Sequence, residues 1–463
     1  MLPLAQLRPT AGELREMVRL AWPIVLAQVG VMLLGVVDTA MVGRIGPDAV
    51  AAVALGHIYW VNVSVPGMGL LLVLDPVVSQ AVGAGDPRGV ARGVQRGVIL
   101  AVLIAIPSAL ALLPGELFFS TLQQPESVTP VAASYARWTA LGAVPFFVFV
   151  ALRQALQAMA HTRAIVIAIV FGNVLNVALN WVLIYGHLGF EPRGVIGSAI
   201  ATVIGRWAML GVLLWFARAQ IWRALSPWQP ESLRLVPLWR MIKVGVPVAF
   251  QQWLEVGVFA AGAIAIGWIG VAPLAAHEIA INLAALTFMV PLGVSAAAAA
   301  IVGRAIGRGD VAAARRDSVA AIGVGLAFMT VAAAVLLAIP EMLAGLFLED
   351  PETLAIATSL LVVAGVFQVF DGIQCVCAGI LRGAGDTRVP MLIHLGGFWG
   401  IGAPLGLLLA FDAGLGPLGI WFGYLGSLAA VAVAQLMRVR WRLSRDISRL
   451  QIDDTNEFAV PDR

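Results

Sequence analysis

The hydrophobic positions of the chain fall into twelve long apolar runs, separated by short polar segments. All of these runs exceed 20 residues, which is the length a helix needs to cross a hydrocarbon core of about 30 Å. The runs cover residues 16–42, 50–83, 90–113, 128–152, 162–186, 194–216, 241–267, 273–303, 311–339, 353–379, 387–411 and 417–441. Lipid offers the backbone no hydrogen-bond partner, and continuous runs of this length are not the alternating strands of a barrel. We therefore expect an all-α polytopic membrane protein with twelve transmembrane helices.

Local signals refine two parts of this pattern. Thr10 followed by Glu13 is the spacing of a capping box and predicts the start of the first helix. Pro66, Pro145 and Pro291 lie inside the second, fourth and eighth runs, where they are expected to interrupt the helices.

The second six runs repeat the first six. A loop motif, Gly83-x-Gly85-Asp86 with Arg92, recurs 224 residues later as Gly307-x-Gly309-Asp310 with Arg316. Further along, the offset becomes 225, where Thr162-Arg163 matches Thr387-Arg388. Six is an even number, so both halves insert with the same orientation. The sequence thus predicts two six-helix lobes related by a pseudo-two-fold axis along the membrane normal.

The repeat also sets the expected domain boundaries. Residues 1–217 form the predicted N-terminal lobe and residues 241–443 the predicted C-terminal lobe. The polar residues 218–240 are expected to be a cytoplasmic linker, and residues 444–463 a cytoplasmic tail.

Composition agrees with membrane insertion and narrows the class of protein. The chain is 60% hydrophobic and 12% charged, whereas about a quarter of the residues of a soluble protein are charged. The arginines stand singly or in small groups between apolar runs, so no nucleic-acid partner is expected. No glycine loop ends in Gly-Lys-Ser/Thr, which argues against an ATP-driven pump. Cys375 and Cys377 lie within one apolar run and are interpreted as buried hydrophobic residues.

The positive charges predict the orientation in the membrane. Of the 29 Lys and Arg residues, two (Arg44 and Arg193) fall in the predicted outer loops, and two (Arg137 and Arg206) fall within spans. The remainder lie on the other side, so both termini are expected to be cytoplasmic. For Arg137 and Arg206 we favour structural ion pairs.

Two acids of the second half are the main candidates for chemistry. Glu255 is near the centre of its span, and Asp371 is about five residues below the middle of its own. A carboxylate at the centre of a membrane helix costs roughly 2.5 to 3.5 kcal/mol on insertion scales. Neither acid has a basic residue of its own half in the same span, so its charged form is disfavoured. We interpret both as ion-coupling sites; the alternative is a permanently protonated structural acid.

The first half offers a different polar group. Asp38 lies in the first span, and Asn176 and Asn180 are one helical turn apart in the fifth. Together with Thr202 they can line a polar pocket. The alternative is that these side chains hold helices together, as polar residues commonly do in membranes. His394 is interpreted as a packed histidine rather than a ligand.

The motifs at these positions resemble the multidrug and toxic compound extrusion (MATE) transporters, in their NorM-like branch. They run over nearly the whole chain and are Val37-Asp38-Thr39-x-Met41-x-Gly43, Gln80-x-x-Gly83-Ala84-Gly85-Asp86, Asn180-Trp181 leading to Ile184-Tyr185-Gly186-His187, Leu254-Glu255-Val256, Ala276-His277, and Asp371-Gly372-x-Gln374 leading to Leu381-Arg382-Gly383-x-x-Asp386-Thr387.

The resemblance implies a two-lobe antiporter of a bacterial cytoplasmic membrane that contributes to antibiotic resistance. It would export amphipathic, often cationic, small molecules in exchange for Na⁺ or H⁺, without a cofactor and without enzymatic activity. We expect it to act as a monomer in the lipid bilayer. The resemblance places cation coupling at Glu255, Asp371 and Asp38, with Glu255 and Asp371 as candidate Na⁺ ligands. It adds polar residues of the substrate cavity, which are Asn176, Asn180, Thr202, Gln252 and Gln374.

Two residues depart from the family pattern. Some relatives carry an acid at the position of Asn180, so a proton site in the first lobe depends on Asp38 alone. Glu278 stands where a glutamine is expected.

Three other classes of protein are less consistent with the sequence. A lipid-linked precursor flippase of the same superfamily, the main alternative, would need a strongly cationic cavity, yet only Arg137 and Arg206 lie within spans. A facilitator-type carrier would not explain Glu255 and Asp371. A membrane enzyme would need His, Asp or Glu residues at catalytic or metal-binding spacing, which the sequence lacks.

Overall fold

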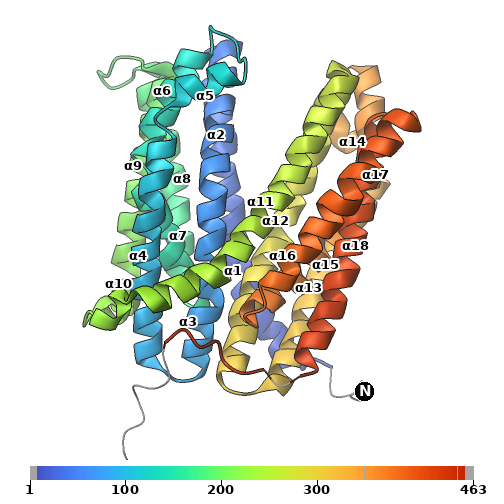
Figure 1. Cartoon of the computed structure of the whole chain (residues 1–463). Helices are drawn as coiled ribbons and strands as arrows, with labels where there is room; N and C mark the ends of the chain where they lie inside the picture. Colours follow the sequence, from blue (N-terminus) through green and yellow to red (C-terminus); the bar gives the residue numbers. More distant parts are fainter. Residues whose placement is uncertain (1–7, 349, 446, 454–463) are drawn as a thin grey trace, which may run out of the picture. The chain divides into compact units, whose positions relative to one another are not determined.

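The described part of the chain is built from helices and their connections (Figure 1). The computed structural model describes residues 8–348, 350–445 and 447–453, so residues 454–463 of the predicted tail lie outside it. The elements are α1 (Ala11–Val42), α2 (Pro47–Leu71), α3 (Leu74–Gly83), α4 (Pro87–Ala111), α5 (Gly115–Thr121), α6 (Thr129–Ala140), α7 (Ala143–Ala158), α8 (Arg163–Tyr185), α9 (Gly194–Phe216), α10 (Arg218–Leu225), the 3-10 helix η2 (Pro230–Leu233), α11 (Leu235–Ile269), α12 (Val271–Gly307), α13 (Val311–Ala338), α14 (Pro340–Gly345), α15 (Pro351–Gly383), α16 (Arg388–His394), the π-helix η3 (Leu395–Gly402), α17 (Ala403–Leu407), the π-helix η4 (Leu408–Asp412) and α18 (Pro417–Leu443).

These elements supply the twelve predicted spans. Eleven helical stretches of the described chain are long and apolar enough to cross a membrane, and they include α2 with α3 and the run from α16 to η4. The pair α6 and α7, bent by 53°, makes the twelfth. The predicted capping box is also present, since Thr10 N donates to Glu13 Oε2 (2.7 Å) and Glu13 N donates to Thr10 Oγ1 (3.2 Å).

Two spans are broken, and each break begins four residues before a proline. The α2–α3 break begins at Leu72, before Pro76, and the α6–α7 break begins at Leu141, before Pro145. A proline ring inside a helix clashes with the carbonyl group of the residue four positions earlier, which explains both positions. The expectation for Pro66 and Pro291 was wrong, because α2 and α12 continue through them.

The chain divides into two compact units that differ from the predicted lobes at their ends. The N-half unit comprises Leu26–Val82, Asp86–Ala249 and residues 451–453. The C-half unit comprises residues 8–25, Gly83–Gly85 and Phe250–Leu450. The start of α1 therefore groups with the second half of the chain, and the start of α11 with the first. The lobe boundaries drawn from the repeat stay a prediction.

The start of α1 is fixed in the C-half unit by apolar packing and by charge. Met17, Leu20 and Ile24 join a buried cluster with residues of α12, α13, α15 and α18. Arg316 Nε lies 2.7 Å from Glu13 Oε1. In the N-half unit the repeat-equivalent Arg92 binds an acid from the other end of the chain, Asp453, at 2.8 Å. The arginine that follows each repeat loop thus pairs with an acid near one end of the chain: Arg316 with Glu13 and Arg92 with Asp453.

The two repeat loops have the same geometry. Asp86 caps α4 by accepting a hydrogen bond from Gly89 N, and Asp310 caps α13 by accepting one from Ala313 N, both at 2.8 Å. The residue before each cap is a glycine with positive φ, 64° at Gly85 and 76° at Gly309. Residues with a Cβ rarely adopt this conformation. The predicted repeat is therefore present in the structure.

Gly379 of α15 approaches α12 so closely that a larger side chain should destabilise the fold. A Cβ at this position would lie 2.2 Å from the carbonyl oxygen of Ser295. Close backbone approach at small residues is a common mode of helix packing in membranes. We expect Gly379→Ala to lower the free energy of unfolding by about 1–3 kcal/mol, measured as a lower thermal midpoint in detergent.

The matched control for this change is Gly323→Ala in the middle of α13. A Cβ at Gly323 would meet no atom within 4 Å, so this variant should match or slightly exceed the stability of the parent. Equal midpoints for the two variants would contradict the packing argument.

Candidate cation-binding site

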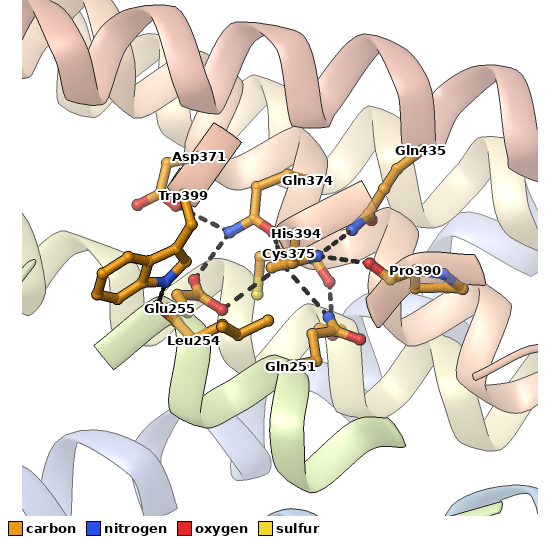
Figure 2. A network of polar contacts seen from close by, with 11 residues as sticks. Gln251, Leu254, Glu255, Asp371, Gln374, Cys375, Pro390, His394, Trp399 and Gln435 are labelled. Atoms are coloured by element: carbon orange, nitrogen blue, oxygen red, sulfur yellow. Dashed lines mark hydrogen bonds and ion pairs between the residues drawn. The ribbon is translucent and has the colours of Figure 1, made fainter. Parts of the chain in front are cut away.

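Glu255 and Asp371, the two acids singled out in the second half, are bridged by a single amide (Figure 2). Gln374 Nε2 donates to Glu255 Oε1 at 3.0 Å and to Asp371 Oδ1 at 3.1 Å. Glu255 comes from α11, whereas Asp371 and Gln374 lie three residues apart on one face of α15. Asp371 and Gln374 are buried, and the side chain of Glu255 is 16% exposed. Two carboxylates and an amide thus share one small volume within the C-half unit.

His394 joins this group, which the sequence did not predict. The side chain is fully buried, and its Nε2 lies 3.1 Å from Gln374 Oε1 and 3.8 Å from Glu255 Oε2. Gln251 Nε2 lies 3.3 Å from the same ring nitrogen. The histidine is packed, as expected, but it packs against polar atoms that connect it to both acids (Figure 2).

Of the two adjacent glutamines on α11, Gln251 is the one that contacts this cluster, through His394. The sequence did not predict this contact, and the assignment of Gln252 to the substrate cavity stays a prediction. Successive residues of a helix point about 100° apart, so Gln251 and Gln252 face different directions and only one of them can reach His394.

A π-helical segment begins directly after His394. In η3 the indole of Trp399 donates from Nε1 to the carbonyl oxygen of Leu254 at 3.1 Å, next to Glu255. Segments of π-helix occur often at functional sites. This hydrogen bond connects η3 to α11 at Leu254, the residue before Glu255 (Figure 2).

A second acidic group lies in the N-half unit, where the structure brings together the four residues predicted to form a pocket. Asn180 Nδ2 donates to Asp38 Oδ1 at 2.5 Å, and Thr202 Oγ1 donates to Asp38 Oδ2 at 3.1 Å. The same Asn180 nitrogen lies 3.1 Å from Asn176 Oδ1. Asp38, Asn176 and Asn180 are buried. The carboxylate therefore accepts hydrogen bonds from neutral donors on α8 and α9.

The two arginines that the sequence predicted within spans make different contacts. Arg137 forms an ion pair with Glu116 at 2.6 Å, as expected. The guanidinium carbon of Arg206 lies 3.8 Å from the centre of the Trp60 ring, an arrangement that favours a cation–π interaction, and Arg206 Nη1 lies 3.5 Å from the carbonyl oxygen of Thr139, beside the α6–α7 break. Arg206 of α9 thus lies beside the bend between α6 and α7, and its closest contacts are this ring and this carbonyl group rather than the predicted ion pair.

The side chains of the Glu255–Gln374–Asp371 group limit which ions it can bind. In the described residues, no group of three or more His, Cys, Asp or Glu side chains is arranged to hold a metal ion. Cys375 and Cys377 are buried and unpaired, as predicted. The pair of carboxylates is suited to a proton or to a cation that prefers oxygen, such as Na⁺.

Comparison with known proteins agrees with the arrangement of the chain. The MatE family model matches residues 23–182 and again residues 247–408, and the two matches begin at the offset of the internal repeat. The chain is 38% identical over 437 residues to "Multidrug resistance protein NorM" of Burkholderia vietnamiensis, covering 92% of this chain and 93% of that protein. It is 35% identical over 487 residues to "Multidrug resistance protein PmpM" of Pseudomonas aeruginosa, covering 99% and 98%.

Solved structures agree at the level of the fold. The crystal structure of the eukaryotic MATE transporter AtDTX14 superposes with a TM-score of 0.84 at 20% identity, covering 93% of this chain and 97% of that one. The outward-facing conformation of a multidrug resistance MATE family transporter gives 0.83 at 21% identity, covering 96% and 98%. With its twelve spans, its internal repeat and these matches over most of its length, the chain belongs to the MatE family of membrane transporters.

Proposed function

We propose that this chain is a secondary antiporter that exports amphipathic, often cationic, compounds in exchange for Na⁺ or H⁺. The observation that carries the proposal is the Glu255–Gln374–Asp371 group, in which two carboxylates lie within membrane spans and share the N–H groups of one neutral amide. Such acids are costly in lipid and typically mark ion or proton pathways. The names of the relatives, multidrug resistance proteins, support the export of drugs.

The energetics suit this exchange. One charge moving down 100 mV releases about 2.3 kcal/mol, and a tenfold concentration gradient costs about 1.4 kcal/mol. One ion per cycle can therefore sustain a tenfold or greater gradient of a neutral substrate. A singly charged cationic substrate needs two ions per cycle, because a one-for-one exchange moves no net charge across the membrane.

We assign three acids to ion coupling, namely Glu255, Asp371 and Asp38. Polar groups for the substrate cavity come from Asn176, Asn180, Thr202, Gln252 and Gln374. We also propose that the chain acts as a monomer in a bacterial cytoplasmic membrane, as the bacterial source of its relatives suggests for the membrane. The distribution of arginine supports an orientation with both termini in the cytoplasm. The flippase alternative is disfavoured, since of the two arginines predicted within spans one is paired with Glu116 and the other stacks on Trp60.

The test is ethidium efflux from proteoliposomes that contain the purified chain. A Na⁺ gradient is imposed at equal pH, and a pH gradient is then imposed without Na⁺. We expect efflux under at least one gradient, well above that of protein-free liposomes. A chain that is folded but inactive under both gradients would refute the antiporter function.

A further inference from the structure

The predicted linker, residues 218–240, is fixed to the N-half unit by one buried amide. The side chain of Gln95 on α4 is fully buried. Its Nε2 lies within hydrogen-bond distance of three linker carbonyl oxygens, those of Ala224 (3.1 Å), Leu225 (3.3 Å) and Pro227 (3.2 Å). Its Oε1 accepts hydrogen bonds from Gln229 N (3.0 Å) and Ser232 Oγ (2.8 Å). The linker is therefore held on α4 and does not hang free between the two halves.

The second half of the repeat lacks these side chains. Arg96, next to Gln95, donates from Nη2 to the carbonyl oxygen of Glu231 at 3.0 Å. The positions 224 residues later are Val319 and Ala320, which cannot form such hydrogen bonds. The contacts of Gln95 and Arg96 thus belong to the one place where the chain passes from the first half to the second.

The linker lies at the level of the membrane surface. It follows α9 and leads into α11, and both helices are long and apolar enough to cross a membrane. Gln95 is eight residues beyond Pro87, the start of α4, which is about 12 Å along the helix axis. The linker therefore packs against the side of α4, nearer to the bilayer than the end of that helix.

The linker is amphipathic and exposes tryptophan. In α10 the side chains of Ile221 and Ala224 are buried, whereas that of Trp222 is 71% exposed. Three more exposed tryptophans lie in the linker or next to it, and they are Trp215, Trp228 and Trp239. Tryptophan is enriched at membrane–water interfaces, where an apolar ring with one polar N–H group is suited to the head-group region.

Positive charge accompanies the exposed indoles. The linker contains four arginines but one acid, Glu231. Arg218 and Arg223 of α10 are exposed, and the guanidinium carbon of Arg218 lies 5.0 Å from the centre of the Trp215 ring. A guanidinium group beside an indole is complementary to a lipid that joins an anionic head group to acyl chains.

We propose that α10 lies in the membrane interface and binds anionic phospholipid. Trp222 sits at the boundary between head groups and acyl chains, and Arg218 and Arg223 bind lipid phosphate. Because Gln95 fixes the linker to α4, the bound lipid stabilises the N-half unit. The segment that joins the two halves is thus a lipid-binding surface, whichever ion drives transport.

The first experiment titrates the purified chain in detergent with anionic dioleoyl phosphatidylglycerol, or with zwitterionic dioleoyl phosphatidylcholine, and follows the thermal midpoint. We expect phosphatidylglycerol to raise the midpoint of the parent more than phosphatidylcholine does. A variant with Arg218→Gln and Arg223→Gln should need roughly tenfold more phosphatidylglycerol for half of this rise, as expected from losing two arginines at a membrane surface.

The matched control combines Arg44→Gln with Arg193→Gln, which removes the same charge from exposed positions outside the linker. It should respond to phosphatidylglycerol as the parent does. Equal responses of the two double variants would overturn the assignment to α10. Glycerophosphoglycerol, the head group without acyl chains, should leave the midpoint unchanged. A rise equal to that caused by the whole lipid would reveal a site for a free anion and overturn the membrane surface.

The second experiment measures the depth of α10 without changing its arginines. Cys375 and Cys377 are buried, so a spin label can be attached to an introduced cysteine. In proteoliposomes, a label on Trp222→Cys should be more accessible to oxygen, and less accessible to a water-soluble nickel complex, than a label on Glu126→Cys. Glu126 is exposed in the loop between α5 and α6. Equal accessibility of the two labels in folded protein would place α10 in water and overturn the inference.

Discussion

Glu255→Gln and Asp371→Asn are each expected to reduce gradient-driven ethidium efflux to the level of protein-free liposomes. Both changes keep the shape of the side chain and remove the group that carries the charge or the proton. An amide oxygen at either position can still accept the hydrogen bond from Gln374, so the local structure has no reason to collapse. Removing a buried charge is often neutral or stabilising. We therefore expect thermal midpoints in detergent equal to or above that of the parent.

Two exposed acids of the C-half unit provide matched controls. Glu352 lies in the first turn of α15 and Asp412 at the end of η4, and both side chains are exposed. The control variants are Glu352→Gln and Asp412→Asn. These variants should transport at the rate of the parent. Full activity of Asp371→Asn, with the protein correctly folded, would remove this acid from the coupling mechanism.

Asp38→Asn is expected to lower efflux by roughly tenfold or more, which corresponds to a loss of at least about 1.4 kcal/mol in the driven step. The asparagine can still accept from Asn180 and can donate to the hydroxyl oxygen of Thr202, so the pocket keeps its hydrogen bonds. What disappears is the negative charge of the Asp38 side chain. Initial rates of efflux under the gradient that drives the parent would measure the effect.

The control for Asp38 is Asp48→Asn, which changes an exposed acid in the first turn of α2. It should leave the rate unchanged. If Asp38→Asn also transports at the rate of the parent, the four residues of this pocket act as polar contacts between helices and not in coupling.

The membrane-spanning helices could be predicted because, in lipid, an apolar run of this length can satisfy its backbone hydrogen bonds only as a helix. The positions at which these helices break could be predicted less well. Pro145 lies beside a real bend, but Pro66 and Pro291 lie in continuous helices. A proline removes one hydrogen bond in each case, and only the packing around it decides whether the helix tolerates the loss or bends.

The acids could be found from the sequence because charge stands out in an apolar span, whereas their neutral partners could not. Gln251 and Gln252 are identical residues side by side, and hydropathy does not reveal which of them faces the protein. In a membrane both the lipid and the protein interior are apolar, so the usual distinction between an inner and an outer face is weak. His394 and Gln435 come from other spans, and only the folded chain brings them together.

The exchange of helix starts between the two units has a consequence for biogenesis. The units change at Val25 and again at Ala249, positions separated by the repeat offset of 224 residues, so each half of the chain contributes the start of its first helix to the other. Met17 and Ile24 leave the ribosome long before α12, α13 and α15 exist to cover them. The start of α1 therefore stays in the bilayer without its packing partners until the second half has been inserted. The buried cluster of the C-half unit is completed only near the end of translation.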